Sequence, residues 1–173
     1  MQSEEGHIDI AVIGNNIYVR PIGYATQNNS LGLPDFFTAM FKQGCNSVSF
    51  DLKDCCGMDS TFLGVIAVAA MSHAHGRDKA VVVLNATVRA RHQLCLIGLT
   101  PVIALKGEPT EPPCGLTLKN VDLVHLPKTE RERIETIKRL HEELIKLNDR
   151  NRQEFARFVE MLEAELQQQS PSH

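Results

Sequence analysis

Two short apolar segments open the chain. Residues 8–13 and 17–22 are rich in β-branched side chains, which favour strands. Gly14, Asn15 and Asn16 separate them, and these residue types tolerate the positive φ of a tight turn. The pattern predicts a β-hairpin, followed by a polar loop over residues 23–32.

Three more segments have the pattern of strands. Residues 47–52 alternate between polar and apolar side chains, residues 80–84 are apolar throughout, and residues 102–105 form a short apolar run. A continuous apolar run is typical of a central strand that is buried on both faces. Residues 53–58 are expected to form a loop.

Helices are expected between these strands. The first begins at Pro34, which suits the first turn of a helix, and ends near Gly44. The second is capped by Asp59 or Ser60 and ends around residues 75–76.

A third helix has Asn85 and Thr87 as its capping residues and ends at Gly98. The order from residue 8 to residue 105 is then strand, strand, helix, strand, helix, strand, helix, strand. This order predicts an α/β fold, in which helices cover a mixed β-sheet.

The pattern changes after residue 105. Residues 106–118 contain three prolines and two glycines and are expected to form a loop, and residues 121–126 are a candidate short strand. Charged residues then accumulate, because residues 128–165 hold 9 of the 18 Lys and Arg and 10 of the 21 Asp and Glu. Apolar residues recur among these charges at spacings of mostly three and four.

That spacing predicts an amphipathic helix or a helical hairpin. The apolar stripe is interrupted at residues 148–152, which fits either a turn between two helices or a polar stagger in one long helix. We therefore divide the chain into an α/β domain (residues 1–127), a helical extension (residues 128–168) and a disordered tail (residues 169–173).

Composition and charge exclude several classes of protein. The net charge of -3 and the pI of about 6.2 argue against a nucleic-acid partner, since such proteins usually carry a basic face. Five cysteines without a Cys-x-x-Cys pair are expected to be reduced thiols. The acidic start lacks the features of a signal peptide, and no apolar run approaches the roughly 20 residues that a bilayer requires. We expect a cytoplasmic protein with no membrane insertion.

The most specific signal is VSFDLKDCCGMDSTFLGVI, residues 48–66. It closely resembles the signature of STAS domains: an apolar strand ending in Asp-Leu, a short loop, then Asp-Ser-Thr or Asp-Ser-Ser followed by a small or apolar residue, Leu and Gly. The resemblance covers about residues 8–105, including the Leu-x-Gly-Leu segment over residues 96–99. It does not extend into the residues after 127.

The resemblance implies a non-enzymatic switch module, similar to the anti-sigma factor antagonists, that a partner kinase phosphorylates. By this similarity Ser60 is the phosphoacceptor and Thr61 the second candidate. A hydroxyl at a helix N-terminus also suits this role physically, because unpaired N–H groups there tolerate a phosphate. Asp-Ser-Thr alone is an ordinary helix cap, so the wider segment carries the functional interpretation. The residues expected at the partner-binding surface are Asp59, Met58, Gly57 and Thr26.

Two features depart from the STAS pattern. Residues 23–26 are Gly-Tyr-Ala-Thr where many members have Gly-Glu-Leu-Asp, so an acidic residue beside the phosphosite is replaced. The charged helical extension is absent from the minimal anti-sigma factor antagonists and indicates a fused interaction element. It is expected to form a homodimer seam or to dock on a partner.

Two alternative functions stay open at this point. In the first, the chain is the small STAS regulatory subunit of a lipid-transporting ABC ATPase, where the domain sits on the ATPase and is not phosphorylated. In the second, the chain is a signalling scaffold, in which the C-terminal helices assemble the domain into homo-oligomers. The expected partner is therefore an anti-sigma-factor-type serine kinase or a related ATPase.

Other chemistry is not indicated. Cys55 and Cys56 with His73 and His75 lack the usual spacing of zinc ligands, and nothing in the sequence places a base beside either thiol. Glycine-rich phosphate loops are absent from the sequence, so a nucleotide would belong to the partner. We expect no metal, no cofactor and no catalytic residue.

Overall fold

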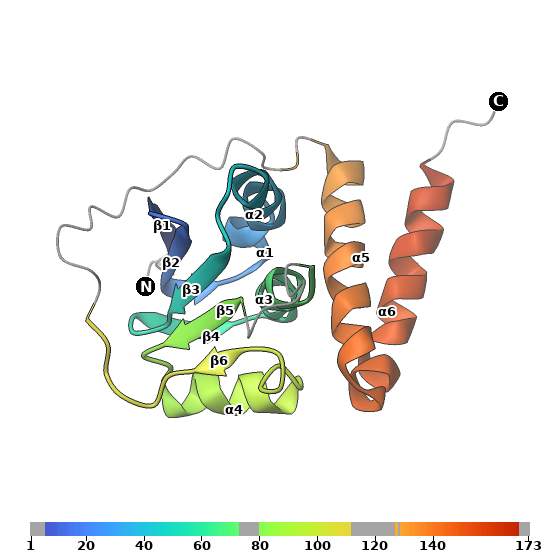
Figure 1. Cartoon of the computed structure of the whole chain (residues 1–173). Helices are drawn as coiled ribbons and strands as arrows, with labels where there is room; N and C mark the ends of the chain where they lie inside the picture. The colour runs from blue at the N-terminus through green and yellow to red at the C-terminus, as the bar shows by residue number, and fades with distance from the viewer. Residues whose placement is uncertain (1–5, 73–79, 112–126, 128, 170–173) are drawn as a thin grey trace, which may run out of the picture.

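The computed structural model describes residues 6–72, 80–111, 127 and 129–169 (Figure 1). The predicted hairpin is confirmed, since β1 (His7–Ile13) and β2 (Asn16–Ala25) pair antiparallel and Ile13 lies opposite Asn16. Gly14 in the turn has a φ of 56°, in the left-handed region that glycine favours. The candidate strand over residues 121–126 and the predicted helix end at residues 75–76 lie outside the described residues.

A mixed sheet follows the hairpin, in the order β1-β2-β3-β5-β6. All of its pairs except β1 with β2 are parallel, and β4 pairs parallel with the end of β2. The strands are β1 (His7–Ile13), β2 (Asn16–Ala25), β3 (Ser47–Asp51), β4 (Cys55–Met58), β5 (Val81–Leu84) and β6 (Ala104–Leu105).

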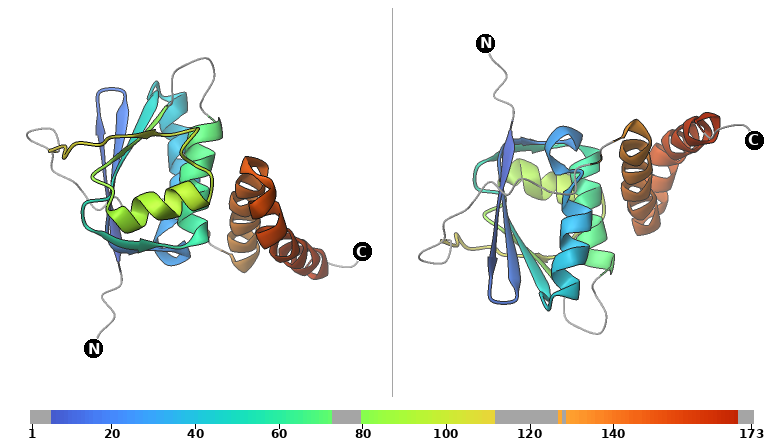
Figure 2. Two further views of the ribbon diagram at one scale, coloured as in Figure 1. Left: turned by 90° about the horizontal axis from the view of Figure 1, so that it is seen from below. Right: turned by 90° about the horizontal axis from the view of Figure 1, so that it is seen from above.

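Helices lie between and after these strands. The layer formed by α1, α2 and α3 covers one side of the sheet (Figures 1 and 2), and α4 contacts β4. The helices are α1 (Gln27–Ser30), α2 (Leu33–Lys42), α3 (Ser60–Ser72), α4 (Val88–Leu96), α5 (Glu130–Leu147) and α6 (Asp149–Gln168).

Two predicted loops are wrong in part. In residues 23–32, β2 continues to Ala25 and α1 follows, because Thr26 and Asn29 form a reciprocal capping box around its first turn. In residues 53–58, the segment from Cys55 forms β4 because the backbone at the end of β2 pairs with it. Thr87 caps α4 as predicted, whereas Asn85 is not a cap and has a φ of 52°.

The core lies between the sheet and the layer of α2 and α3. Phe50 of β3 contacts Phe37 of α2 and Phe62 of α3, edge to face, with 6.0 Å between ring centroids in both pairs. Residues 61–70 of α3 are buried without exception. A helix that is buried on every side needs a second layer over its outer side.

The helical extension supplies that layer. It forms two helices, so the hairpin alternative is confirmed, and α5 lies on the outer side of α3 with α6 beyond it (Figures 1 and 2). A Cβ atom at Gly64 of α3 would lie 2.8 Å from Leu140 Cβ and 2.9 Å from the Leu140 carbonyl oxygen. Gly64 therefore permits the close approach of α5. The buried residues of α5 are Ile134, Ile137, Leu140, His141 and Leu144.

Asparagines fix the turn of this hairpin to the α/β domain. Asn148 has extended backbone and caps α6 by accepting from the Asn151 amide at 2.8 Å. The side-chain amides of Asn148 and Asn151 both donate to the carbonyl oxygen of Ile97 after α4, at 3.2 and 2.8 Å. These bonds explain why the stripe is interrupted at this point.

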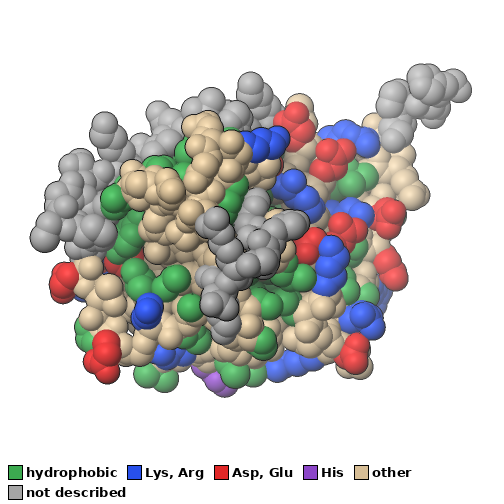
Figure 3. Space-filling view, viewed as in Figure 1, with side chains coloured by type: hydrophobic (Ala, Val, Ile, Leu, Met, Phe, Trp, Pro, Cys, Tyr) green, Lys and Arg blue, Asp and Glu red, His purple; other side chains and the backbone are tan. Residues whose placement is uncertain are grey.

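The outer surface of the hairpin is highly charged. Figure 3 shows Lys and Arg interspersed with Asp and Glu over this part of the molecule. The buried stripe of α5 is used within the chain, so a homodimer through these helices, which stays a prediction, would use the exposed Phe158 and Met161 of α6. In the described part of the chain no helix combines the length and apolar character needed to cross a bilayer.

Candidate functional site

Asp59 organises the site at the start of α3. Its Oδ1 accepts from the amide of Phe62 at 2.8 Å, which caps α3, and its Oδ2 accepts from the amide of Gln27 at 2.8 Å. The Asp59 amide donates to the carbonyl oxygen of Ala25. One carboxylate thus holds the first turns of α1 and α3 together, in agreement with the capping role predicted for it.

Thr26 lies at the other end of this bridge. Its Oγ1 accepts from the Asn28 amide at 3.3 Å, and its own amide donates to Asn29 Oδ1 at 2.9 Å. The residue that stands where many STAS domains have an aspartate therefore begins a helical turn. The structure brings Thr26 and Asp59 together, since Gln27 follows directly after Thr26.

Ser60 is the first residue of α3, and its hydroxyl has a partner that the sequence did not suggest. Ser60 Oγ lies 2.9 Å from Nε2 of His141, which belongs to α5 and is 81 positions later in the chain. Ser60 is half-buried, and His141 is 2% exposed. The helical extension therefore reaches the predicted phosphosite directly.

The second bond of His141 fixes the direction of the first. His141 Nδ1 lies 2.8 Å from the carbonyl oxygen of Ile137, which only accepts, so Nδ1 carries the hydrogen. Burial lowers the pKa of His141, against the opposing effects of the Ile137 carbonyl and the Asp59 charge. In the neutral imidazole Nε2 is an acceptor, and the Ser60 hydroxyl donates to it.

Aromatic rings enclose the other side of the imidazole. The centroids of Phe155 and Phe158 of α6 lie 5.4 and 4.9 Å from that of His141, both edge to face. His141 therefore joins α3, α5 and α6. The available sequence signal was its place in the apolar stripe of α5, beside Ile137, Leu140 and Leu144, but a stripe does not show which residue it contacts.

Comparisons with known proteins bear on the α/β domain. No protein-family model and no curated protein matches the chain. Among solved structures, the protein TM1081, determined by NMR, is 17% identical, with a TM-score of 0.50 over 56% of this chain and 78% of that one. The unphosphorylated anti-sigma factor antagonist SpoIIAA is 12% identical, with a TM-score of 0.49 over 58% of this chain and 88% of that one.

A third solved structure is an anti-sigma factor antagonist from Mycobacterium paratuberculosis, 16% identical, with a TM-score of 0.44 over 60% of this chain and 87% of that one. At these identities the likeness concerns the fold. The predicted α/β class, with a mixed sheet covered by helices, is confirmed.

The remaining predicted site residues of the α/β domain are less accessible. Thr61 is 4% exposed and Met58 is 8% exposed. Gly57 is buried under the ring of Tyr24, from which a Cβ atom at this position would be 3.1 Å away. Tyr24 itself is 54% exposed, so it presents the aromatic surface at this place.

The cysteines of β4 have different environments. Burial raises the pKa of the Cys55 thiol, which makes the thiolate scarce, whereas Cys56 is exposed. His73 and His75 lie outside the described residues. Within the residues that the structure describes, no cluster of three or more His, Cys, Asp or Glu has the arrangement of a metal site.

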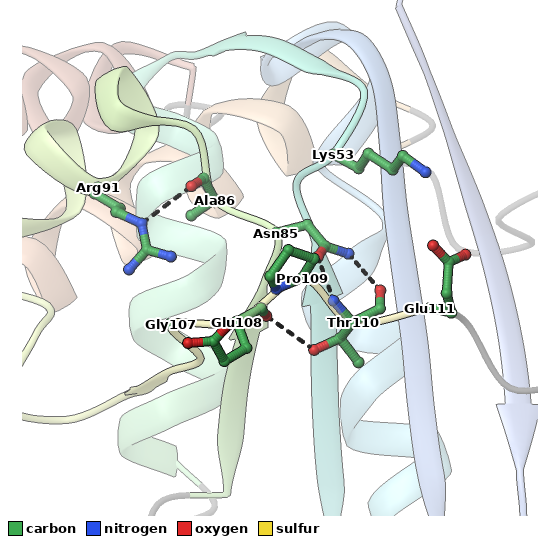
Figure 4. Close-up of a pocket in the computed structure, with 9 residues that line it drawn as sticks. All are labelled: Lys53, Asn85, Ala86, Arg91, Gly107, Glu108, Pro109, Thr110 and Glu111. Atoms are coloured by element: carbon green, nitrogen blue, oxygen red, sulfur yellow. Dashed lines mark hydrogen bonds between the residues drawn. The ribbon is translucent and has the colours of Figure 1, made fainter.

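A pocket of about 310 Å³ lies at the carboxyl ends of β3, β5 and β6 (Figure 4). Asn85 stands at its centre, where its amide nitrogen donates to Asp51 Oδ1 and to the Thr110 carbonyl oxygen, both at 2.8 Å. The Thr110 amide donates back to Asn85 Oδ1 at 2.8 Å. These groups bind one another and hold the loop after β6 against the sheet, which gives the pocket a structural role.

Proposed function

We propose that this chain is a phosphorylation-controlled protein–protein interaction switch that resembles an anti-sigma factor antagonist. Ser60 is the phosphoacceptor for a serine kinase of the anti-sigma type, and the chain has no catalytic activity of its own. The setting is cytoplasmic. The observation that carries the proposal is the Ser60 hydroxyl in the first turn of α3, beside the Asp59 cap, on a STAS-like fold.

The transfer requires a nucleoside triphosphate bound by the partner kinase. Ser60 Oγ attacks the γ-phosphorus, the bond from that phosphorus to the β–γ bridging oxygen breaks, and a nucleoside diphosphate leaves. The hydroxyl proton goes to a base of the kinase. The product adds about -1.5 to -2 charges in the first turn of α3, where N–H groups and the helix dipole favour an anion.

Burial favours Ser60 over Thr61 as the acceptor. Thr61 is 4% exposed, and a kinase has to surround the hydroxyl that it modifies. Ser60 is half-buried, and what limits its exposure on one side is the helical extension. Thr61 would require α3 itself to unwind.

The partner surface that we propose surrounds this first turn. Asp59 and Thr26 are half-buried and contribute backbone and side-chain edges. Gly57 and Met58 are buried beneath this surface. The lack of a side chain at Gly57 lets the Tyr24 ring pack closely against β4, and Met58 is the last residue of that strand. Tyr24 adds an exposed aromatic side chain, a residue type enriched at interfaces.

The test is phosphosite mapping of the full-length protein isolated from its own cells. Wild type should carry phosphate at Ser60, Ser60→Ala should carry none, and Thr61→Val should match wild type. In pull-downs with the partner, Ser60→Ala should hold the protein in one partner-bound state, and Ser60→Asp should weaken the binding to that partner. An unmodified protein under several growth conditions, with both variants binding like wild type, would overturn the proposal.

One observation favours a second candidate, the STAS regulatory subunit of a lipid-transporting ABC ATPase. The Ser60 hydroxyl is hydrogen-bonded to His141 of the same chain. A serine that is never phosphorylated can keep such a bond permanently. In that case Ser60 stays unmodified in cells and the protein co-purifies with an ATPase. The scaffold alternative predicts instead a solution mass well above 19.2 kDa.

A further inference from the structure

The helical extension covers the predicted acceptor. The Ser60 hydroxyl donates to Nε2 of the buried His141, so its hydrogen points into the interface between α3 and α5. Their heavy atoms are 2.9 Å apart, which is a full hydrogen-bond contact with no space between them. A kinase cannot enclose this hydroxyl while α5 lies against it.

The product fits this interface even less well. A phosphoryl group replaces one hydrogen by a phosphorus and three oxygens, and it brings negative charge next to the Asp59 carboxylate. On the hairpin side it meets a neutral imidazole enclosed by Phe155 and Phe158. An anion in such surroundings is poorly solvated, which disfavours the docked state.

The remaining contacts show what holds the hairpin in place. Contacts on either side of His141 along the hairpin attach it to the α/β domain. Leu140 packs closely on Gly64. The side-chain amides of Asn148 and Asn151 donate to the Ile97 carbonyl oxygen. At the surface, Arg139 pairs with Asp35 of α2 at 3.2 Å. These contacts attach the hairpin without the help of Ser60. Among the residues named at this interface, Ser60 is the one for which we propose a covalent modification.

We infer that the hairpin of α5 and α6 is an intramolecular cover of Ser60, so that docking of the hairpin and phosphorylation of Ser60 exclude each other. This inference rests on the proposed function. The docked form resists the kinase, and phosphate on Ser60, once added, keeps the hairpin away from α3. The surface of α3 and the inner face of α5 then become available together.

The test uses a substitution that weakens docking without touching the acceptor. Gly64→Ala places a methyl group against the Leu140 backbone, which cannot move unless α5 moves. Gly107→Ala is the matched control, because a Cβ atom there meets nothing within 4 Å. His141→Phe is the second variant, since it removes the acceptor of the Ser60 hydrogen bond and keeps an aromatic ring beside Phe155 and Phe158.

Each full-length variant is expressed in the protein's own cells, and the phosphorylated fraction of Ser60 is followed over time. We expect phosphorylation about tenfold faster in Gly64→Ala and faster in His141→Phe, as a larger open population requires, with Gly107→Ala like wild type. Circular dichroism checks that each variant is folded. Hydrogen exchange in α5 should be faster in the phosphorylated protein than in the unmodified one.

The outcomes separate this inference from the proposed function. Phosphate at Ser60 at equal rates in all variants, with unchanged exchange in α5, overturns the cover and leaves the phosphoacceptor in place. Phosphate in none of them overturns both. If Gly64→Ala does not fold, His141→Phe and the exchange of the phosphorylated wild type decide.

Discussion

At the scale of single residues, the buried imidazole of His141 is the feature with the clearest consequence. It is neutral because burial disfavours its charged form. Among the residues that the structure describes, the Asp59 carboxylate of α3 is the charge that partly offsets this effect. The groups of α6 that pack against it are the uncharged rings of Phe155 and Phe158. The docked hairpin therefore depends on a proton staying off this ring.

This gives a pH dependence with a definite sign. The folded pKa of His141 is lowered below the ordinary value of 6.5, so the unfolded chain binds the proton more readily. Its contribution to stability is complete above pH 6.5 and is lost as the pH falls below that value. The free energy of urea unfolding should decrease between about pH 7.5 and pH 5.5, and less so in His141→Phe. The exposed His92 of α4, changed to Gln, is the control and should behave like wild type.

Asp59 supports a second prediction at this scale. Asp59→Ala removes the acceptor of the Phe62 and Gln27 amides together, so it should cost about 1–3 kcal/mol in the free energy of unfolding. Asp149→Ala, a carboxylate that is exposed in the first turn of α6, should cost less. Equal losses in urea titrations of the two variants would contradict the bridging role of Asp59.

At the scale of elements, the junction after β5 combines an unusual backbone with a complete set of hydrogen bonds. Asn85 has a φ of 52°, in the left-handed region, and its side chain ties Asp51 of β3 to the loop at Thr110. Asparagine suits this position because it tolerates that conformation better than most residues. The backbone conformation and the side-chain hydrogen bonds of Asn85 therefore contribute separately to the stability of the fold.

Two substitutions separate them. Asn85→Gly loses the side-chain bonds but keeps the backbone relaxed, whereas Asn85→Ala loses the same bonds and is also strained. We expect Ala to be less stable than Gly by about 1–2 kcal/mol in thermal or urea unfolding, despite the usual advantage of alanine. If Ala is the more stable of the two, the backbone at this junction is not strained.

How far the sequence predicted these elements depends on where each one finds its partners. The hairpin of β1 and β2, the helix at Pro34 and the apolar strand predicted over residues 80–84 follow from local patterns. These predictions are confirmed, the strand being β5 (Val81–Leu84). The segment β4 was missed because its stability comes from a distant group, the edge of β2. The segment α1 is stabilised both by the local capping box of Thr26 and Asn29 and by the distant Asp59 carboxylate. No pattern within a few residues of Cys55 indicates β4, whereas Thr26 and Asn29 are a local capping signal that the predicted loop left unused.

The site shows the same division. Asp59 as a cap follows from its place before an apolar helix, and the structure agrees. The contact between Ser60 and His141 joins residues 81 apart, and the apolar stripe of α5 indicated only that this face would be buried. The similarity to STAS domains gave no help there, because it ends before the extension begins.

At the scale of the whole molecule, the α/β domain and the hairpin share one core. Leu140 and Leu144 of α5 belong to the same buried cluster as Phe62 and Ile66 of α3. The ion pairs on the outer surface, such as that of Arg131 with Glu135, are exposed and contribute little by comparison. Apolar packing and the two asparagines of the turn hold the hairpin.

This shared core predicts coupled unfolding. Leu140→Ala, at a side chain with 0% exposure, should lower the free energy of unfolding by about 2–5 kcal/mol, and Met161→Ala, 62% exposed on the same hairpin, by much less. In urea, far-ultraviolet circular dichroism and tyrosine fluorescence from the α/β domain should give the same midpoint in wild type. Two separate midpoints would mean that the hairpin unfolds independently.

The hairpin and the surface that it covers belong to the same polypeptide chain. A protein that binds this surface therefore competes with a tethered segment, which changes its apparent affinity. A tethered ligand acts at a fixed effective concentration that dilution does not reduce. The apparent affinity of any protein that binds α3 at Ser60 is therefore its intrinsic affinity multiplied by the fraction of molecules in which the hairpin is open. A substitution that weakens docking, such as Leu140→Ala in α5, would therefore lower the cellular concentration at which such a protein begins to bind, although it leaves the surface of α3 unchanged.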